Sequence, residues 1–134
     1  MAELTVDVVS VDRNLWSGKA KNVVAKTPEG DIGILPGHEP VLALLVESPL
    51  RIESVEGTKV LIAVHGGFFS VDSDVVTILA ETAELAEEID IDRAKLALDR
   101  AKAAGADDPD ELAAIRRAET RIQTASLAKG IKAH

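Results

Sequence analysis

The hydrophobic period of this sequence changes once, near residue 88, and this change limits the possible folds more than any other feature. Before it, apolar residues alternate with polar ones in short runs, which is the period of half-buried strands. After it, apolar residues recur every three or four positions, which is the period of amphipathic helices. The sequence therefore predicts a β domain over residues 1–87 and a helical domain over residues 88–134.

The first part consists of short β-branched or apolar runs separated by turn signals. The turn signals are Trp16-Ser17-Gly18, Pro28-Glu29-Gly30, Pro36-Gly37, Ser48-Pro49, Glu56-Gly57, Gly66-Gly67 and Asp72-Ser73-Asp74. Since no helical segment lies between these runs, they predict an antiparallel sandwich or barrel. No helix follows Gly66-Gly67, so we interpret this pair as a tight turn or bulge and not as a phosphate-binding loop.

The second part has the signals of two helices. Asp90 precedes the first helix, and Gly105 stands where a terminating glycine is common. The segment Asp108-Pro109-Asp110-Glu111 is typical of a helix start, with a capping acid, a proline at the first helical position and a glutamate three residues on. About four residues separate the helices, so we expect an antiparallel hairpin and an α+β fold overall.

The apolar stripes of this hairpin are thin. In the first helix the large apolar residues are Leu96 and Leu98, among alanines. The second helix has a stripe of Leu112, Ile115, Ala118, Ile122 and Ala125. Each buried methylene contributes only about 0.8 kcal/mol, and helices of this length are marginal in isolation. We therefore expect the hairpin to dock weakly and to be able to leave the β domain.

Composition excludes several classes of function. The chain has no Cys, which excludes disulfides and thiolate metal sites, and its three aromatic residues are too few for a base-stacking platform. A net charge of −8 argues against nucleic acid as a partner. The acids are concentrated in residues 1–88, whereas residues 116–134 hold five basic residues and one acid. We expect no secretory signal and no membrane span, and hence a cytosol-like compartment.

No pattern of catalytic residues is present. The sequence lacks the phosphate-binding, dinucleotide-binding and nucleophile-elbow glycine motifs. Its histidines are far apart, and His65, at the end of a strand run, is interpreted as a turn or core-edge residue. Asp72 and Asp74 flank a serine in a predicted turn, where aspartate is common for backbone reasons. We expect no catalysis by this chain alone, no metal site and no required cofactor, so a small hydrolytic enzyme is disfavoured.

Four segments together resemble one known family. They are Leu15-Trp16-Ser17-Gly18, the segment Gly33-Ile34-Leu35-Pro36-Gly37-His38 with Pro40, Gly66-Gly67-Phe68, and Val76-Thr77-Ile78-Leu79-Ala80 leading into Ile89-Asp90. In this order and spacing the chain resembles, over essentially its whole length, the epsilon subunit of bacterial and chloroplast F-type ATP synthases. The family fold, a β-sandwich followed by a helical hairpin, agrees with the two periods.

The resemblance implies a non-catalytic rotor subunit of the central stalk. In the family the sandwich binds the gamma subunit and the ring of membrane c subunits, with an acid and a histidine in the ring-facing loops. Asp31 and His38 match these positions, although His38 has a turn-stabilising hydrogen bond as its alternative role. The protein would be peripheral, bound to the membrane only through the complex. It would lie at the cytoplasmic face of the bacterial plasma membrane, or at the stromal face of the thylakoid if plastid-encoded.

The hairpin of the family can extend along gamma toward the catalytic alpha and beta subunits and inhibit ATP hydrolysis. Here Arg117 and Arg121 stand four residues apart on one helix face, and Arg116 is close to them. This cationic patch suits an acidic partner surface. A solvated helix face is the alternative interpretation.

Several family members also bind ATP, as a regulatory ligand, through an Ile/Leu-Asp-x-x-Arg-Ala motif. Every position of it is matched here, by Ile89, Asp90, Arg93 and Ala94, and the accompanying acid and arginine are matched by Glu84 and Arg100. Guanidinium groups suit phosphate oxygens. A nucleotide-sensing module that binds ATP at the hairpin is therefore the alternative function.

Overall fold

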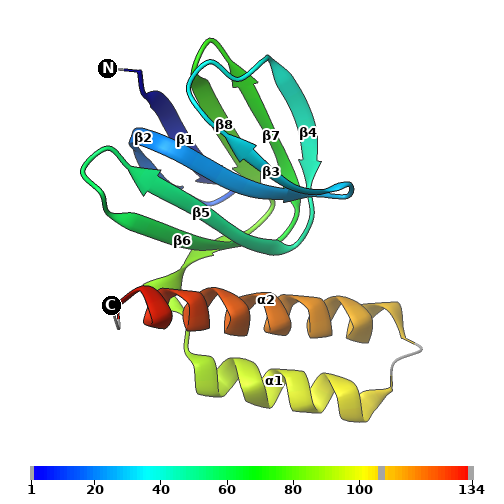
Figure 1. Cartoon of the computed structure of the whole chain (residues 1–134). Coiled ribbons are helices and arrows are strands. Elements are labelled where there is room, and N and C mark those ends of the chain that lie inside the picture. Colours follow the sequence, from blue (N-terminus) through cyan, green and yellow to red (C-terminus); the bar gives the residue numbers. More distant parts are fainter. Residues whose placement is uncertain (1, 106–107, 133–134) are drawn as a thin grey trace.

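The computed structural model describes residues 2–105 and 108–132, and in them the chain forms nine strands followed by two long helices (Figure 1). The strands are β1 (Leu4–Ser10), β2 (Asn14–Thr27), β3 (Gly30–Ile34), β4 (Val41–Leu45), β5 (Ser48–Ser54), β6 (Lys59–Val64), β7 (Gly67–Asp72), β8 (Val75–Ala80) and β9 (Ala83–Leu85). A short 3-10 turn, η1 (Ala86–Glu88), leads to α1 (Ile91–Ala104) and α2 (Pro109–Lys132). The predicted α+β fold, a β-sandwich with a helical hairpin, is confirmed.

The strands are hydrogen-bonded in the order β4-β7-β8-β1-β2-β5-β6-β9. The remaining strand, β3, pairs with the C-terminal half of β2, at residues 23–27. Figure 1 shows β5 and β6 on the side of the helices, and β4, β7 and β8 on the opposite side. All pairs are antiparallel, as predicted, except β1 with β8, which are parallel. These two strands are far apart in the chain, so no hairpin turn fixes their relative direction.

The core of the sandwich follows the predicted alternation. In β1 the buried positions are Leu4, Val6 and Val8, which have no exposed surface, and the residues between them are half-buried. The largest fully buried side chain is Phe69 of β7. All buried residues of this core cluster lie between residues 4 and 83. The sandwich therefore has a hydrophobic core of its own, to which the hairpin does not contribute.

Two predicted turns are wrong, because both segments lie inside strands. Trp16-Ser17-Gly18 is part of β2, where a Cβ on Gly18 would lie 2.9 Å from the Trp16 ring. The glycine thus makes room for the aromatic ring, and the turn comes earlier, at residues 11–13. Ser48-Pro49 opens β5, where Pro49 is the second residue and stands opposite Ala63. A proline is tolerated near the start of a strand.

The helices pack as two layers on the sandwich, with α2 between α1 and the sheet (Figure 1). Leu96, one of the two large apolar residues in the expected stripe of the first helix, is 57% exposed, whereas the buried residues of α1 are the alanines Ala94 and Ala101. In α2, Ala118 and Ala125 of the predicted stripe are buried, whereas Leu112 is 38% exposed. Alanine side chains allow the backbones of α1 and α2 to approach closely. The packing gained in this way stabilises the hairpin more than burial of Leu96 would. Neither helix, over the described residues, has an apolar stretch long enough to cross a membrane.

A second buried face of α2 was not predicted. It consists of Thr120 and Thr124, and Ala128 lies one turn further on. Thr124 donates its hydroxyl hydrogen to the carbonyl of Thr120 (2.7 Å), so this polar group is satisfied inside the helix. The contact of α2 with β5 and β6 therefore combines small and hydroxyl-bearing side chains with Leu127, which lines a pocket with Ile52 and Leu61.

Candidate functional site

An ion pair joins the hairpin to the sandwich. Nε of Arg121, in α2, lies 2.8 Å and 3.1 Å from the two carboxylate oxygens of Glu84, and its Nη2 lies 2.7 Å from Oε1. Glu84 is held in place because β9 pairs with β6, which puts it opposite Ala63. The pairing of a guanidinium fork with a carboxylate is among the stronger charged contacts in proteins.

A buried histidine extends this contact into the sandwich. His65 directly follows β6 and is 5% exposed. Its Nδ1 lies 3.2 Å from Oε2 of Glu47, between β4 and β5, and its Nε2 lies 3.6 Å from Oε1 of Glu84. We call Glu47, His65, Glu84 and Arg121 the junction cluster. The predicted core-edge location of His65 is confirmed, but the cluster itself was not predicted.

The junction cluster favours the ionised form of Glu84. His65, when its Nε2 carries a hydrogen, and the guanidinium of Arg121 lower the pKa of the Glu84 carboxyl to about 2, against the opposing effect of burial. A second pair lies beside the cluster, where Arg13 donates to Glu88 of η1 over 2.6 Å and 2.8 Å. This second pair ties the connection before α1 to the turn between β1 and β2.

Glu84 should make the stability of the protein depend on pH below 4.5. Its pKa is lower in the folded chain, so it stabilises the fold above its ordinary pKa of 4.5, and this contribution is lost as the pH falls toward 2. We expect Glu84→Gln to lower the free energy of unfolding at pH 7 by about 1–3 kcal/mol. Urea unfolding should show this difference shrinking between pH 4.5 and 2.5, with exposed Glu56→Gln as the control. A difference that stays constant with pH would contradict this role of Glu84.

A pocket of about 420 Å³ lies between β9 and the hairpin. It collects five of the six residues predicted for ATP, Glu84, Ile89, Asp90, Arg93 and Ala94, together with Glu88, Ala97 and Arg121. Asp90 also caps α1 as predicted, since its Oδ1 accepts a hydrogen bond from the Arg93 N–H (3.1 Å). The sixth residue, Arg100, does not line this pocket. It stands seven residues after Arg93, about 10 Å further along the helix axis.

The charges of this pocket suit a ligand with both anionic and donor groups. Three carboxylates and two guanidinium groups face it, and the Arg121 guanidinium is already paired with Glu84. Arg93 is exposed and makes no ion pair with another described residue. Its guanidinium can therefore bind phosphate oxygens without first breaking a contact.

The two predicted ring-contact residues stand apart. Asp31 is exposed in β3, opposite Lys26 of β2, near the turn between these strands. His38 is half-buried in the loop beyond the other end of β3. Its backbone N–H donates to the Leu35 carbonyl (3.0 Å) and its Nδ1 lies 2.7 Å from the Glu39 carbonyl, so the turn-stabilising role is present.

The three predicted partner-contact arginines also differ in environment. Arg116 is exposed, whereas Arg117 and Arg121 are half-buried. Arg116 and Glu119 border an open groove beside Val46 and Glu47. Only Arg121 is engaged in an ion pair with a described residue.

An apolar face lies on the side of the sandwich opposite the helices. Leu42 and Leu44 of β4, Phe68 of β7 and Leu79 of β8 are 73%, 62%, 45% and 42% exposed, and we call them the apolar face. Leu44 stands opposite Phe68, and Phe68 opposite Leu79, so these three side chains form a row across adjacent strands. This face was not predicted, although the sequence carried its signal. Uninterrupted apolar runs such as Val41–Val46 indicate strands that are covered on both sides.

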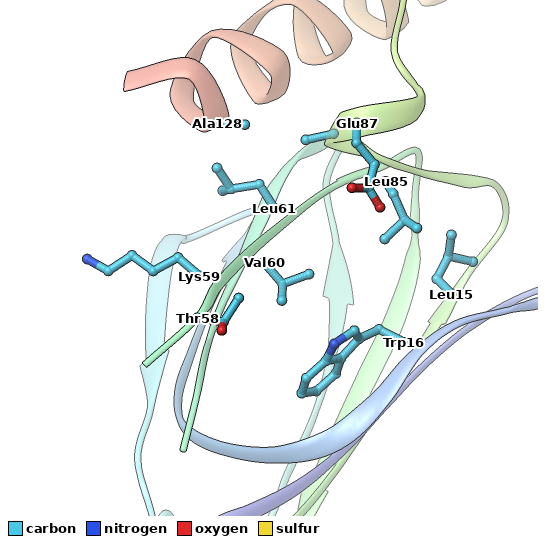
Figure 2. Close-up of a pocket in the computed structure, with 10 residues that line it drawn as sticks. Leu15, Trp16, Thr58, Lys59, Val60, Leu61, Leu85, Glu87 and Ala128 are labelled. Atoms are coloured by element: carbon cyan, nitrogen blue, oxygen red, sulfur yellow. The ribbon is translucent and has the colours of Figure 1, made fainter. Parts of the chain in front are cut away.

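A second pocket, of about 360 Å³, opens between the sandwich and the end of α2 (Figure 2). Trp16, Leu15 and Leu85 line it from the sandwich, and Ala128 borders it from α2. Figure 2 shows the Trp16 ring directed into this space below Val60. Trp16 is the only tryptophan of the chain, so its fluorescence can report whether α2 is docked.

Comparison with known proteins gives one consistent result. The family model "ATP synthase, Delta/Epsilon chain, beta-sandwich domain" matches residues 3–86. The ATP synthase epsilon chain of Rhodococcus jostii is 50% identical over 129 residues, which cover 96% of this chain and 100% of that one. The epsilon chain of Streptomyces griseus is 49% identical over 126 residues, which cover 94% and 98%.

Solved structures agree with the sequence relatives. A chain in the Euglena gracilis mitochondrial ATP synthase (OSCP/F1/c-ring) aligns with a TM-score of 0.74 at 25% identity, covering 98% of this chain and 82% of its own. A chain in the central stalk/c-ring of the Tetrahymena thermophila enzyme has the same fold, with a TM-score of 0.63 at 16% identity over 93% and 95%. The chain belongs to the ATP synthase epsilon-chain family and is a subunit of that complex.

Proposed function

We propose that this subunit is non-catalytic, that its sandwich (residues 1–87) links gamma to the c ring, and that its hairpin (residues 88–134) restrains ATP hydrolysis. The apolar face is the observation that carries the first part. Monomeric proteins rarely expose apolar side chains in one contiguous row, and such surfaces are typical of protein interfaces. The row of Leu44, Phe68 and Leu79 thus provides a binding surface that remains accessible while the hairpin is docked.

Gamma is the partner that we assign to the apolar face. The chain matches its relatives over nearly their full length, and the Tetrahymena thermophila chain with the same fold belongs to a central stalk/c-ring assembly. A stalk subunit needs a permanent contact with the rotating shaft, and apolar surfaces suit permanent contacts. The test is binding of the full chain to isolated gamma, which should give a stable complex. No complex at micromolar concentrations would overturn this function.

For the c ring, we propose contacts at Asp31 and His38. Asp31 is exposed and free to meet a polar ring loop, and the imidazole of His38 is partly accessible. Asp31 lies near the start of β3 and His38 beyond its end, so a ring surface that contacts both would cover this strand. The protein would then reach the membrane only through the complex, at the cytoplasmic face of the bacterial plasma membrane or, in a plastid, at the stromal face of the thylakoid.

The regulatory role depends on release of the hairpin. In the docked form Arg121 is occupied by Glu84, whereas Arg116 is exposed and Arg117 is partly so. Release would free Arg121 and bring all three arginines to one surface for acidic groups of the alpha and beta subunits. Thr120 and Thr124 between α2 and the sheet support this release, because buried threonines remove less apolar area from water than leucine or isoleucine would.

The alternative function, sensing of ATP, is supported by the pocket beside β9. Five predicted residues line it, and Arg93 is available for phosphate. A nucleotide there would touch both the sandwich, through Glu84, and the hairpin, through Arg93. It would therefore stabilise the docked form, since a ligand favours the state that binds it better.

Calorimetric titration of the full chain with ATP tests this alternative. We expect binding by the wild-type chain and a loss of at least about tenfold in affinity for Arg93→Ala, because a charge-assisted contact contributes about 1.5–3 kcal/mol. The control is Lys95→Ala, an exposed cation on the same helix that does not line the pocket. Absence of heat at millimolar ATP would remove the sensing function.

A further inference from the structure

The junction cluster supplies the ion pair that holds α2 on the sandwich. The sheet-facing side of α2 presents Thr120, Thr124, Leu127 and Ala128, and pockets of about 360 Å³ and 270 Å³ border its last turns. Among the residues that the structure describes, Glu84–Arg121 is the only ion pair between α2 and the sandwich. Loss of this one pair should therefore shift the balance between docked and released hairpin.

His65 contacts a carboxylate on each side but can satisfy only one of them while neutral. Nδ1 lies 3.2 Å from Glu47, and it donates there only if it carries the single ring hydrogen. Nε2 then has a lone pair that faces the Glu84 carboxylate at 3.6 Å. This buried nitrogen has no hydrogen-bond partner among the described residues. The docked form tolerates the mismatch because Arg121 supplies the donors that Glu84 needs.

When α2 leaves the sandwich, the hydrogen-bond donor of Glu84 changes. Glu84 loses both hydrogen bonds from Arg121, and a second proton on His65 would turn Nε2 into a donor directed at Glu84. In the docked form that proton would place a second cation beside the same carboxylate, in a ring that is 5% exposed. Arg116 and Glu119 of α2 border the groove beside Glu47 and offset each other in charge. The second proton therefore binds better once α2 has left.

We propose that His65 replaces Arg121 as the partner of Glu84, so that release of the hairpin takes up one proton at His65 and is favoured by acid. Because linkage is reciprocal, a proton that binds the released form better must shift the population toward release. The inference rests on the proposed release of the hairpin, but it does not require that the hairpin inhibits hydrolysis. It gives the regulatory unit a response to pH.

Distance measurements on the full chain test the proposal. The chain has no cysteine, so Lys21→Cys in β2 and Ser126→Cys in α2, both exposed, allow two spin labels to be attached. Pulsed electron paramagnetic resonance then gives the ratio of docked to released hairpin. We expect this ratio to fall by about tenfold between pH 8 and 5.5, because the released form takes up the additional proton. Trp16 emission should shift to the red in parallel, because its pocket loses Ala128.

Matched variants identify the titrating group. His65→Gln keeps a donor for Glu47 and should remove the pH dependence, whereas His38→Gln, in the loop after β3, should retain it. Arg121→Gln leaves the sandwich core untouched and should be largely released already at pH 8, so it tests the switch even if His65→Gln fails to fold. A wild-type ratio that is constant with pH, a pH dependence that survives His65→Gln, or a docked hairpin in Arg121→Gln would overturn the proposal. Gamma binding, measured separately, would be unaffected by such a failure.

Discussion

Replacing Gly67 with alanine is expected to destabilise the sandwich by at least about 4 kcal/mol, a size seen only for severe lesions. Gly67 has φ +122°, a conformation that side-chain-bearing residues rarely adopt. A Cβ there would lie 2.1 Å from the Leu79 carbonyl oxygen and 2.8 Å from the Ala80 Cα. Both obstacles are backbone atoms of β8, which pairs with β7 at this residue, so neither can move without breaking the ladder.

Urea unfolding followed by circular dichroism measures this effect. Gly33→Ala is the matched control, because Gly33 also lies in a strand but has open space around it and no positive φ. We expect Gly33→Ala to change the free energy of unfolding by less than about 1 kcal/mol. If Gly67→Ala were as stable as this control, the close approach of β7 and β8 would be wrong.

The double substitution Leu44→Asp and Phe68→Asp should lower affinity for gamma by at least about 100-fold. The two residues are neighbours on β4 and β7, at the centre of the apolar face. An unpaired carboxylate buried in an apolar interface costs several kcal/mol, and each 1.4 kcal/mol is tenfold in affinity. Because both side chains are about half exposed in the free subunit, the fold should tolerate the change.

Titration of gamma with the double variant gives this affinity. The matched control is Val11→Asp with Val55→Asp, the same change of an exposed apolar residue to a charged one outside the apolar face. Circular dichroism should show that both double variants are folded. Equal affinity of the two variants for gamma would place the gamma contact elsewhere on the sandwich.

Local signals in the sequence were sufficient for the fold class. The alternation in β1 predicted which of its residues are buried, and Asp90 and Asp108 marked the starts of the two helices. The cap of α2 is present, since Asp108 Oδ1 accepts from the Asp110 N–H (2.9 Å). Such signals act within a few residues, so they are readable without knowing how the chain folds back on itself.

The junction cluster could not be predicted from such local signals, because its residues are far apart in the sequence. His65 and Glu47 are 18 residues apart, and Arg121 and Glu84 are 37 apart. They meet only because β9, a strand of three residues that the sequence did not reveal, pairs with β6. The exposure of Leu96 has a related cause: the hydrophobic period marks apolar positions of a helix, but the close approach of α1 and α2 decides that Ala94 and Ala101 are the buried ones.

The central claim is that the hairpin is a detachable restraint on a sandwich that binds the stalk. The rate of ATP hydrolysis by the assembled enzyme tests it most directly, measured with the full chain and with a chain ending at residue 88. The core of the sandwich lies within residues 4–83, so the shortened chain should fold and assemble. We expect severalfold faster hydrolysis with the shortened chain, whereas an unchanged rate in a fully assembled enzyme would contradict the claim.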